Sequence, residues 1–410
     1  MTRLCVEDRT DWRGWVTPKP LEVKPIHRWY TFPHSFTSEL VHALANEWGL
    51  GPSDCILDPF AGAGTTILAA KEMGIPATGY DLSPLAVFVS QVKLANYAVG
   101  RLERIWLRLI KGMHPSDWNG VARKYPELVY KALPGKLLAA FDAVDRWITE
   151  VSESELERNF FRLALLAVLP KYSRAVATGG WLKWVPKRNG ASGVASTLRD
   201  RVRLMLNDVR AAQLPRHASW GVKLSDARAL PDEGPLYSAV ITSPPYPNRH
   251  DYTRVFGVEL MFAFLDWEGA RQLRYQSFHS HPEARPNRPD ADGYEQPRAL
   301  TKSVAEVRKR GKDPRIPKML EGYFLDMYLS LREMRRVCRL GAKIALVVGN
   351  AQYCGESIAV DELTAEVGEQ AGLTCEKLLA VRYRGNSAQQ MGKFGRNPSR
   401  ESVVIFSRTT

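Results

Sequence analysis

Short runs of β-branched and apolar residues alternate along the chain with stretches of helical periodicity. The runs predict buried strands at residues 55–57, 77–80, 222–224, 239–242, 343–348, 378–383 and 403–407. The helical stretches lie at residues 38–48, 66–73, 251–265 and 323–339. Alternation of this kind predicts an α/β fold.

The alternation is interrupted between the second and third predicted strands. We expect residues 101–216 to form a mostly helical, basic insertion that divides the main domain into residues 27–100 and 217–410. Residues 1–26 are rich in Pro, Trp and charge and predict an extended N-terminal arm. The polar, Arg-rich segment 266–317 predicts a basic mobile loop within the main domain.

Charge narrows the choice of partner, because the 410 residues carry a formal net charge of +13 with a pI near 9.5. Such a balance favours a polyanion, either nucleic acid or an acidic membrane surface. No stretch approaches the roughly 20 apolar residues of a membrane span, so we expect no membrane segment. Residues 171–223 hold eleven Lys or Arg against two Asp, which is most of the net charge.

Tryptophans and glycines are interleaved with the basic residues of this stretch, and the glycines predict irregular structure. Basic groups match phosphates, while aromatic faces can stack on bases. We therefore expect nucleic-acid contacts from Lys171, Arg174, Trp181, Lys183, Trp184, Lys187 and Arg188, with Arg249 added from a later loop. The alternative is a solvated basic face with structural tryptophans.

The five cysteines are scattered, odd in number and without the spacing of metal ligands. They predict a reducing, cytoplasmic environment, no bound metal and no disulfide scaffold. The charged N-terminus has no apolar signal region, which agrees with that environment.

A glycine turn follows the first predicted strand, in the sequence Asp58-Pro59-Phe60-Ala61-Gly62-Ala63-Gly64-Thr65-Thr66. Glycines let a backbone approach a ligand closely, and the helix that follows offers free N–H groups. Asp81 ends the next strand, where dinucleotide-binding folds hold a ribose diol. No Lys follows the last glycine, which argues against a phosphate-binding loop of nucleotide triphosphatases. An NAD-dependent oxidoreductase shares such a turn.

A second motif, Ser243-Pro244-Pro245-Tyr246, follows the strand at residues 239–242. Two prolines remove two N–H donors and fix φ twice, so the loop presents carbonyl acceptors in a set direction. A hydroxyl and an aromatic face lie beside them. This combination suits a planar amine such as the exocyclic amino group of a nucleobase, although a proline-stiffened loop without chemistry has the same sequence.

Together, the glycine turn and the Ser-Pro-Pro-Tyr motif resemble those of the amino-directed DNA methyltransferases. These enzymes transfer a methyl group from S-adenosylmethionine to cytosine N4 or adenine N6. The resemblance covers about residues 27–96 and 220–407 and leaves the insertion unaccounted for. It implies a Rossmann-like sheet of seven strands, the last two forming an antiparallel pair.

The resemblance also implies a pocket for S-adenosyl-L-methionine. Its residues would be Tyr30, Thr31, Phe32, Asp58, Pro59, Phe60, Ala61, Gly62, Gly64, Thr65, Thr66, Asp81, Leu82, Ser83, Asp226 and Ala227. Within this set, Asp81 would hold the ribose hydroxyls and Asp226 would face the adenine amino group. The motif Tyr30-Thr31-Phe32 would close over the methionine moiety.

Ser243, Pro244, Pro245 and Tyr246 would be the catalytic residues. We expect the target base to flip out of duplex DNA and stack on Tyr246. Ser243 Oγ and the Pro244 carbonyl would then accept its two amino hydrogens. Serine before Pro-Pro-Tyr accompanies cytosine N4 more often than adenine N6 in this family, and the absence of a Pro-Cys motif argues against C5-cytosine methylation.

We therefore expect a cytosine-N4 methyltransferase of double-stranded DNA that uses the insertion at residues 101–216 to recognise its target. The family further suggests a modification enzyme of a restriction–modification system, with a cognate restriction endonuclease as a partner. Three alternatives stay open: methylation of adenine N6, methylation of an RNA base, and a nucleic-acid-binding protein that keeps an inactive methyltransferase fold.

Overall fold

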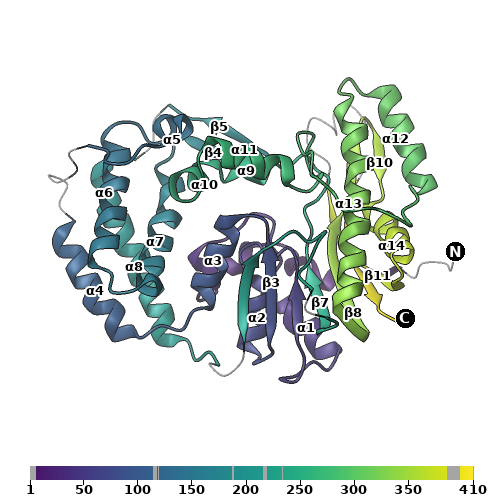
Figure 1. The fold of residues 1–410 in the computed structure, drawn as a ribbon, viewed down its shortest axis with the longest axis horizontal. Helices are drawn as coiled ribbons and strands as arrows, with labels where there is room; N and C mark the ends of the chain where they lie inside the picture. Colours follow the sequence, from purple (N-terminus) through teal and green to yellow (C-terminus); the bar gives the residue numbers. More distant parts are fainter. Residues whose placement is uncertain are drawn as a thin grey trace.

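The computed structural model describes residues 6–113, 118, 120–186, 189–215, 219–232, 234–385 and 398–409. Figure 1 shows a central sheet flanked by helices, with a separate group of helices beside it. Among the described residues, no helix has the length and apolar character that crossing a membrane requires.

The central sheet is mostly parallel. In spatial order its strands are β1 (Val6–Asp8), β11 (Thr374–Arg384), β12 (Ser399–Ser407), β8 (Cys338–Gly349), β7 (Tyr237–Thr242), β2 (Ile56–Asp58), β3 (Ala77–Asp81) and β6 (Trp220–Leu224). Only β12 runs antiparallel to its neighbours β8 and β11. The predicted Rossmann-like α/β fold with an antiparallel final pair is confirmed, and β1 adds an eighth strand.

Helices cover both faces of this sheet, and alternate residues of its strands point to opposite faces. Ile56 and Ile241 pack with α1 (Ser38–Glu47), α2 (Thr65–Glu72) and α3 (Pro84–Leu94). Leu57 and Val240 pack with α13 (Arg315–Val337) and α14 (Val360–Gln370). Burial on both faces explains why these strands are continuous apolar runs.

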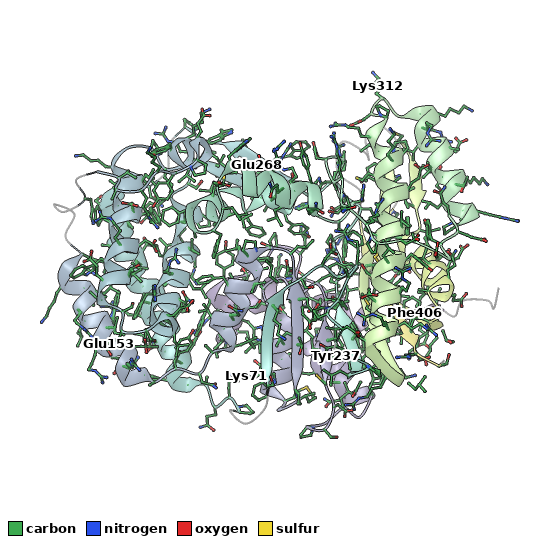
Figure 2. All side chains as sticks on the ribbon, viewed as in Figure 1. Lys71, Glu153, Tyr237, Glu268, Lys312 and Phe406 are labelled. Carbon is green, nitrogen blue, oxygen red and sulfur yellow. The ribbon has the colours of Figure 1, made fainter. Side chains whose placement is uncertain are left out.

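Side chains fill both layers, as Figure 2 shows. Tyr237 and Phe406 are buried within the sheet layers, whereas Glu153, Glu268 and Lys312 lie on the surface.

The segment between β3 and β6 forms a helical lobe. It consists of α4 (Val99–Gly112), α5 (Glu127–Ala132), α6 (Lys136–Val151), α7 (Glu155–Val168), a hairpin of β4 (Ala175–Thr178) and β5 (Trp181–Trp184), and α8 (Val194–Ala211). The basic stretch that its glycines predicted as irregular therefore contains a hairpin and the long helix α8. After β7, helices α9 (Tyr252–Val255), α10 (Gly257–Ala263) and α11 (Trp267–Gln276) run between this lobe and the rest of the domain (Figure 1).

The prediction of an extended arm over residues 1–26 is wrong for the part that the structure describes. Strand β1 pairs in parallel with β11, and two 3-10 helices follow at Thr10–Gly14 and Lys19–Glu22. Trp12 and Leu21 in these helices, and Val16 between them, are buried. Burial of these few large residues outweighs the polar composition on which the prediction rested.

The segment 266–317 is not a loop either, because it contains α11, α12 (Arg298–Arg310) and the start of α13. Helix α12 buries Leu300, Val304 and Val307, spaced four and three residues apart, against α13. This narrow apolar stripe is enough to dock a helix whose remaining residues are mostly charged.

Candidate active site

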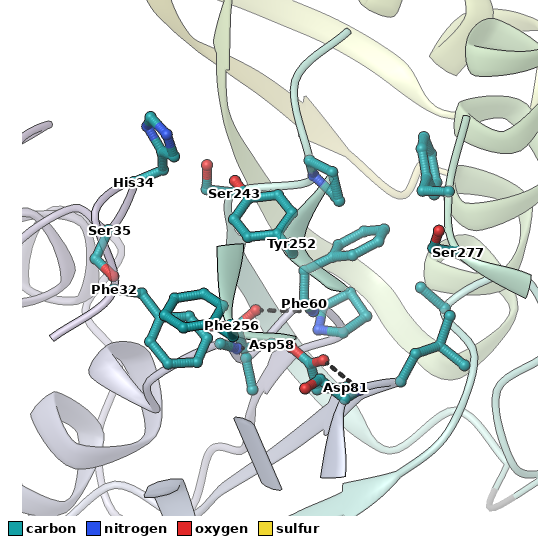
Figure 3. Close-up of a pocket in the computed structure, with 18 of the residues that line it drawn as sticks. Phe32, His34, Ser35, Asp58, Phe60, Asp81, Ser243, Tyr252, Phe256 and Ser277 are labelled. Atoms are coloured by element: carbon teal, nitrogen blue, oxygen red, sulfur yellow. Dashed lines mark hydrogen bonds between the residues drawn. The ribbon is translucent and has the colours of Figure 1, made fainter. Parts of the chain in front are cut away.

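The carboxyl ends of β2, β3, β6 and β7 meet at one pocket (Figure 3). β3 and β6 lie on one side of β2 and β7 lies on the other, so the pocket forms where the strand order reverses, the usual ligand site of such sheets. Of the predicted residues, the pocket is lined by Phe32, Asp58, Pro59, Phe60, Ala61, Gly62, Thr65, Asp81, Leu82, Ser83, Asp226, Ala227, Ser243 and Pro245.

The glycine turn depends on the two glycines. Gly62 and Gly64 have φ values of 51° and 77°, a region that disfavours other residues. A Cβ atom on Gly64 would lie 2.7 Å from Ser90 Oγ. That hydroxyl donates a hydrogen bond of 3.0 Å to the Gly62 carbonyl. The turn is therefore fixed against α3, and the N-terminus of α2 begins at the pocket.

Asp81 and Asp58 are held by hydrogen bonds at the ends of their strands. Asp81 accepts N–H groups from Gly62 at 2.9 Å and Ser83 at 2.8 Å, and burial raises the pKa of its carboxyl. Asp58 accepts the Thr242 hydroxyl at 2.6 Å, and burial raises its pKa to about 6. Asp58 thus joins the glycine turn to the residue that precedes Ser243.

Asp226 is oriented by a buried arginine that sequence reasoning missed. Arg228 donates from Nε and Nη2 to the two oxygens of Asp226, at 2.9 and 2.7 Å. Its Nη1 donates to Asp326 Oδ1 at 3.1 Å. A carboxylate has about four lone-pair sites, so Asp226 can still accept an adenine amino group. No local spacing in the sequence joins Asp326 to this site.

The Ser-Pro-Pro-Tyr motif is divided between the pocket and the structure behind it. Ser243 Oγ donates to the Val347 carbonyl at 3.1 Å, which leaves its lone pairs free to accept. Pro245 lines the pocket, whereas Pro244 and Tyr246 do not. The Tyr246 hydroxyl donates to Glu401 at 3.3 Å. Tyr246 thus lies outside the pocket lining, and its hydroxyl joins the loop to β12.

The upstream aromatic motif is likewise divided. Phe32 lines the pocket and packs on Phe256 with ring centroids 4.5 Å apart. Tyr30, Thr31, Gly64 and Thr66 lie outside the pocket lining. The buried Lys93 donates to the carbonyl of Tyr30 at 2.6 Å and to that of Ala63 at 3.0 Å. One ammonium group therefore joins the aromatic motif to the glycine turn.

The chain is similar in sequence to known proteins. The DNA methylase family profile matches residues 13–91. Type II methyltransferase M.AvaI of Anabaena variabilis is 30% identical over 94% of this chain and 87% of its own, and M.BsoBI of Geobacillus stearothermophilus is 29% identical over 93% and 86%. The chain belongs to the type II DNA methyltransferases. Their amino-directed family, whose cofactor is S-adenosylmethionine, is the one that the two motifs resemble.

Other matches to this methyltransferase are narrower or weaker. A tRNA (guanine(10)-N2)-dimethyltransferase of Methanothermobacter thermautotrophicus is 30% identical over 20% of this chain and 25% of its own. The solved structure of TrmN from Thermus thermophilus aligns over 90% of this chain and 48% of its own, with a TM-score of 0.30 and 11% identity.

The methyltransferase pocket also contains residues that sequence reasoning did not select. They are His34, Ser35, Phe36, Ser225, Tyr252, Thr253, Phe256, Leu260, Leu273, Ser277 and Phe278. Tyr252 lies beside Ser243 in Figure 3, and burial raises the pKa of its hydroxyl. The sequence predicts a helix at residues 251–265, and nothing in that pattern marks its aromatic residues as part of a pocket.

The predicted DNA-binding residues of the methyltransferase gather near the β4–β5 hairpin. On β5, Lys183 is exposed, and Trp181 and Trp184 are 50% and 48% exposed. Lys171 and Arg174 precede β4, and Arg249 is brought next to the hairpin turn. Lys187 and Arg188 lie outside the described residues.

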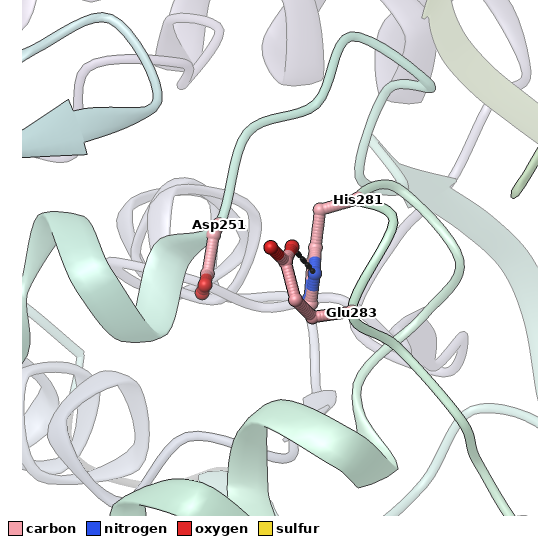
Figure 4. Close-up of side chains that lie close together, drawn as sticks. All are labelled: Asp251, His281 and Glu283. Carbon is pink, nitrogen blue, oxygen red and sulfur yellow. Dashed lines mark ion pairs between the residues drawn. The ribbon is translucent and has the colours of Figure 1, made fainter. Parts of the chain in front are cut away.

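A group of metal-ligand residue types lies beside this region (Figure 4). Ligand atoms of Asp251, His281 and Glu283 lie within 4.8 Å of one another. Arg274 and Arg254 approach Asp251 Oδ2 at 2.9 and 3.3 Å, and Arg254 also lies 3.5 Å from Glu283. Guanidinium groups thus compensate both carboxylates, and the cluster fits an ion-pair network better than a cation site.

Proposed function

We propose that this methyltransferase transfers a methyl group from S-adenosylmethionine to the N4 amino group of cytosine in double-stranded DNA. The observation that carries the proposal is Ser243 Oγ, which lines the same pocket as the cofactor motifs and is already donating to Val347. Its free lone pairs can accept only from a donor such as an amino group. Serine at this motif position supports cytosine as the base.

In the proposed reaction, the protein acts mainly by positioning the two reactants. When bound, S-adenosylmethionine provides an activated methyl group on its sulfonium, and the protein provides alignment and electrostatics. Asp81 would hold the ribose hydroxyls, and Asp226, fixed by Arg228, would accept the adenine amine. The glycine turn would hold the methionine end. Alignment of two bound reactants can lower a barrier by roughly 7–11 kcal/mol.

The base reaches this pocket by flipping out of the duplex, at a cost of a few kcal/mol. Ser243 Oγ and the Pro244 carbonyl would accept the amino hydrogens and hold them out of the ring plane. The nitrogen lone pair would then be localised for attack on the methyl carbon, with S-adenosylhomocysteine as the leaving group and one amino proton lost to solvent. Tyr246 is the stacking residue that the motif suggests, and Tyr252, which lines the pocket, supplies a second aromatic face.

Two observations make double-stranded DNA the proposed substrate: the positive charge near the hairpin and the kind of protein to which the chain is similar. The exposed Lys171, Lys183 and hairpin tryptophans suit phosphates and bases. The relatives that match most of the chain are type II methyltransferases, whereas the tRNA-modifying relative matches only a fifth of it. We propose a role as the modification enzyme of a restriction–modification system, acting in the cytoplasm with a cognate endonuclease.

The test is to incubate the protein with S-adenosylmethionine and mixed-sequence duplex DNA, then digest the DNA and weigh the nucleosides. N4-methylcytosine is the expected product, and the Ser243→Ala protein serves as the inactive control. N6-methyladenine would overturn the choice of base and keep the enzyme class. Methylation of RNA in place of DNA would overturn the substrate.

A further inference from the structure

The turn of the β4–β5 hairpin lies in backbone contact with the loop that follows the catalytic motif. A Cβ atom built on Gly180 would lie 2.8 Å from the Arg249 carbonyl oxygen and 3.1 Å from His250 Cα. No side chain fits at this position without moving one of the two segments. The hairpin and the loop are some seventy positions apart in the sequence, so this contact is a product of the fold alone.

Trp181, the next residue of the hairpin, contacts the same loop a few residues later, at Arg254. The guanidinium carbon of Arg254 lies 5.1 Å from the centre of the Trp181 ring, within the range of a cation–π interaction. Arg254 belongs to α9, whose first N–H groups are capped by Asp251, at 3.0 Å from Thr253 and 3.2 Å from Arg254. The hairpin therefore contacts both ends of the segment 249–254.

That segment carries part of the pocket. Tyr252 and Thr253 line it together with Ser243 and Pro245. The backbone of Arg249 has a φ of 67°, an unfavourable value for arginine, and its N–H donates to the Ser280 carbonyl at 2.9 Å. A backbone held in such a conformation needs support from its surroundings, and the hairpin turn provides it.

We propose that Gly180 and Trp181 are positioning residues for the catalytic loop, through which the hairpin sets the place of Tyr252 in the base pocket. The inference rests on the proposed function, because the same short strand carries Lys183 and Trp184 toward the DNA. A change in the hairpin's position on DNA would then also change the position of Tyr252 in the base pocket.

Single-turnover methylation of a duplex with 2-aminopurine next to the target base tests this proposal. Gly180→Ala is expected to lower the methylation rate on the order of 10²-fold, the effect of a small misplacement of reacting groups. Its affinities for S-adenosylmethionine and for DNA stay at the wild-type level. Gly190→Ala is the matched control, because a Cβ there meets nothing closer than 3.9 Å.

A second pair of variants guards against a folding defect in Gly180→Ala. Trp181→Leu and Trp184→Leu each remove one half-exposed indole from β5, and of these two indoles Trp181 is the one that packs against an arginine of the described residues. We expect a lower rate for Trp181→Leu than for Trp184→Leu at saturating DNA. Equal rates in this pair, or a wild-type rate in Gly180→Ala, overturn the inference. Wild-type protein that methylates no DNA overturns the proposed function instead.

Discussion

The residues of the site fall into two kinds. Some can be predicted from the chemistry of a sequence motif, and others owe their place in the site to packing against distant parts of the chain. Gly62, Gly64 and Asp81 could be predicted because a glycine turn followed by an acid at the next strand end has few other uses. Arg228 and Tyr252 could not, because their roles come from neighbours distant in the sequence. Ser243 is of the first kind, and its role is open to a direct test.

Ser243→Ala is expected to lower the methylation rate by about 10²–10³-fold, as loss of one preorganised hydrogen bond to a reacting group does. The hydroxyl donates to the Val347 carbonyl and not to any of the acids or glycines of the expected cofactor site, so we expect its loss to leave that site in place. Calorimetric titration with S-adenosylhomocysteine should give a wild-type dissociation constant. Loss of cofactor affinity in parallel with activity would show that Ser243 supports the pocket instead.

Glu259 predicts a pH dependence of stability. Burial raises the pKa of its carboxyl from 4.5 to about 7, so the folded state binds the proton more tightly than the unfolded state. Its contribution to stability is fully present below pH 4.5 and is lost as the pH rises through 7. Glu259→Gln should therefore be more stable than wild type at pH 8, by up to roughly 3 kcal/mol.

Urea unfolding at pH 5 and pH 8 checks this expectation. The advantage of Glu259→Gln should be small at the lower pH and large at the higher one. A constant difference between the two proteins would mean that packing around Tyr30, 3.5 Å away, and not ionisation, determines the effect.

At the scale of elements, strands and the helices that follow them were predictable, and short or charged elements were not. The apolar runs of β7 and β8 predicted buried strands because parallel strands are covered on both faces. Strand β1 has the sequence Val6-Glu7-Asp8, which carries no strand signal, and it exists because β11 offers an open edge. Helix α12 could not be predicted from its mostly charged sequence, because its narrow apolar stripe becomes significant only when it packs against α13.

Asp326 on α13 shows how one element holds several others. Its Oδ1 accepts from Arg228 at 3.1 Å and Arg288 at 2.7 Å, and its Oδ2 accepts the backbone N–H and ring Nδ1 of His279, both at 2.9 Å. Burial would raise its pKa, but the hydrogen bond from His279 and the two arginine charges hold the pKa at about 2. Helix α13 is thereby joined, through Arg228, to Asp226 and, directly, to the segment around residue 279.

Asp326→Asn is expected to cost about 3–5 kcal/mol of unfolding free energy at pH 7, because it removes the buried carboxylate charge that Arg228 and Arg288 share and leaves Asp226 alone to compensate Arg228. It should also weaken binding of S-adenosylmethionine, since Arg228 orients Asp226. Chemical denaturation and cofactor titration measure the two effects. Asp313→Asn, which breaks an exposed pair with Arg315, is the control and should cost less than about 1 kcal/mol.

The stability from Asp326 also has a pH limit. Its depressed pKa means that the contribution is present above pH 3.8 and is lost as the pH falls through 2. The Asp326→Asn protein should not show this loss of stability at low pH. Stability curves of the two proteins that stay parallel between pH 4 and pH 2 would contradict the assignment.

At the scale of the whole molecule, charge and fold favour the same place for the proposed contact with DNA. The insertion carries most of the net charge of +13, and the fold places its hairpin against the loop that follows the Ser-Pro-Pro-Tyr motif. Composition alone could predict a polyanionic partner, but not that the basic stretch would fold back to the pocket. That placement depends on the packing of the helical lobe against α10, where Tyr125 and Phe262 stack at 5.3 Å.

Salt dependence of DNA binding tests the placement. The logarithm of the binding constant falls with the logarithm of salt concentration, with a slope of about −0.9 for each phosphate contact. Lys171→Ala and Lys183→Ala should each reduce the size of that slope by about 0.9, on target and non-target duplexes alike. Lys111→Ala should leave the slope unchanged, because Lys111 belongs to α4, the helix on the side of the lobe away from the rest of the domain in Figure 1. If the control changed the slope and the hairpin variants did not, the DNA would lie along the outer helices, and Trp181 and Trp184 would be solvated side chains of a structural hairpin.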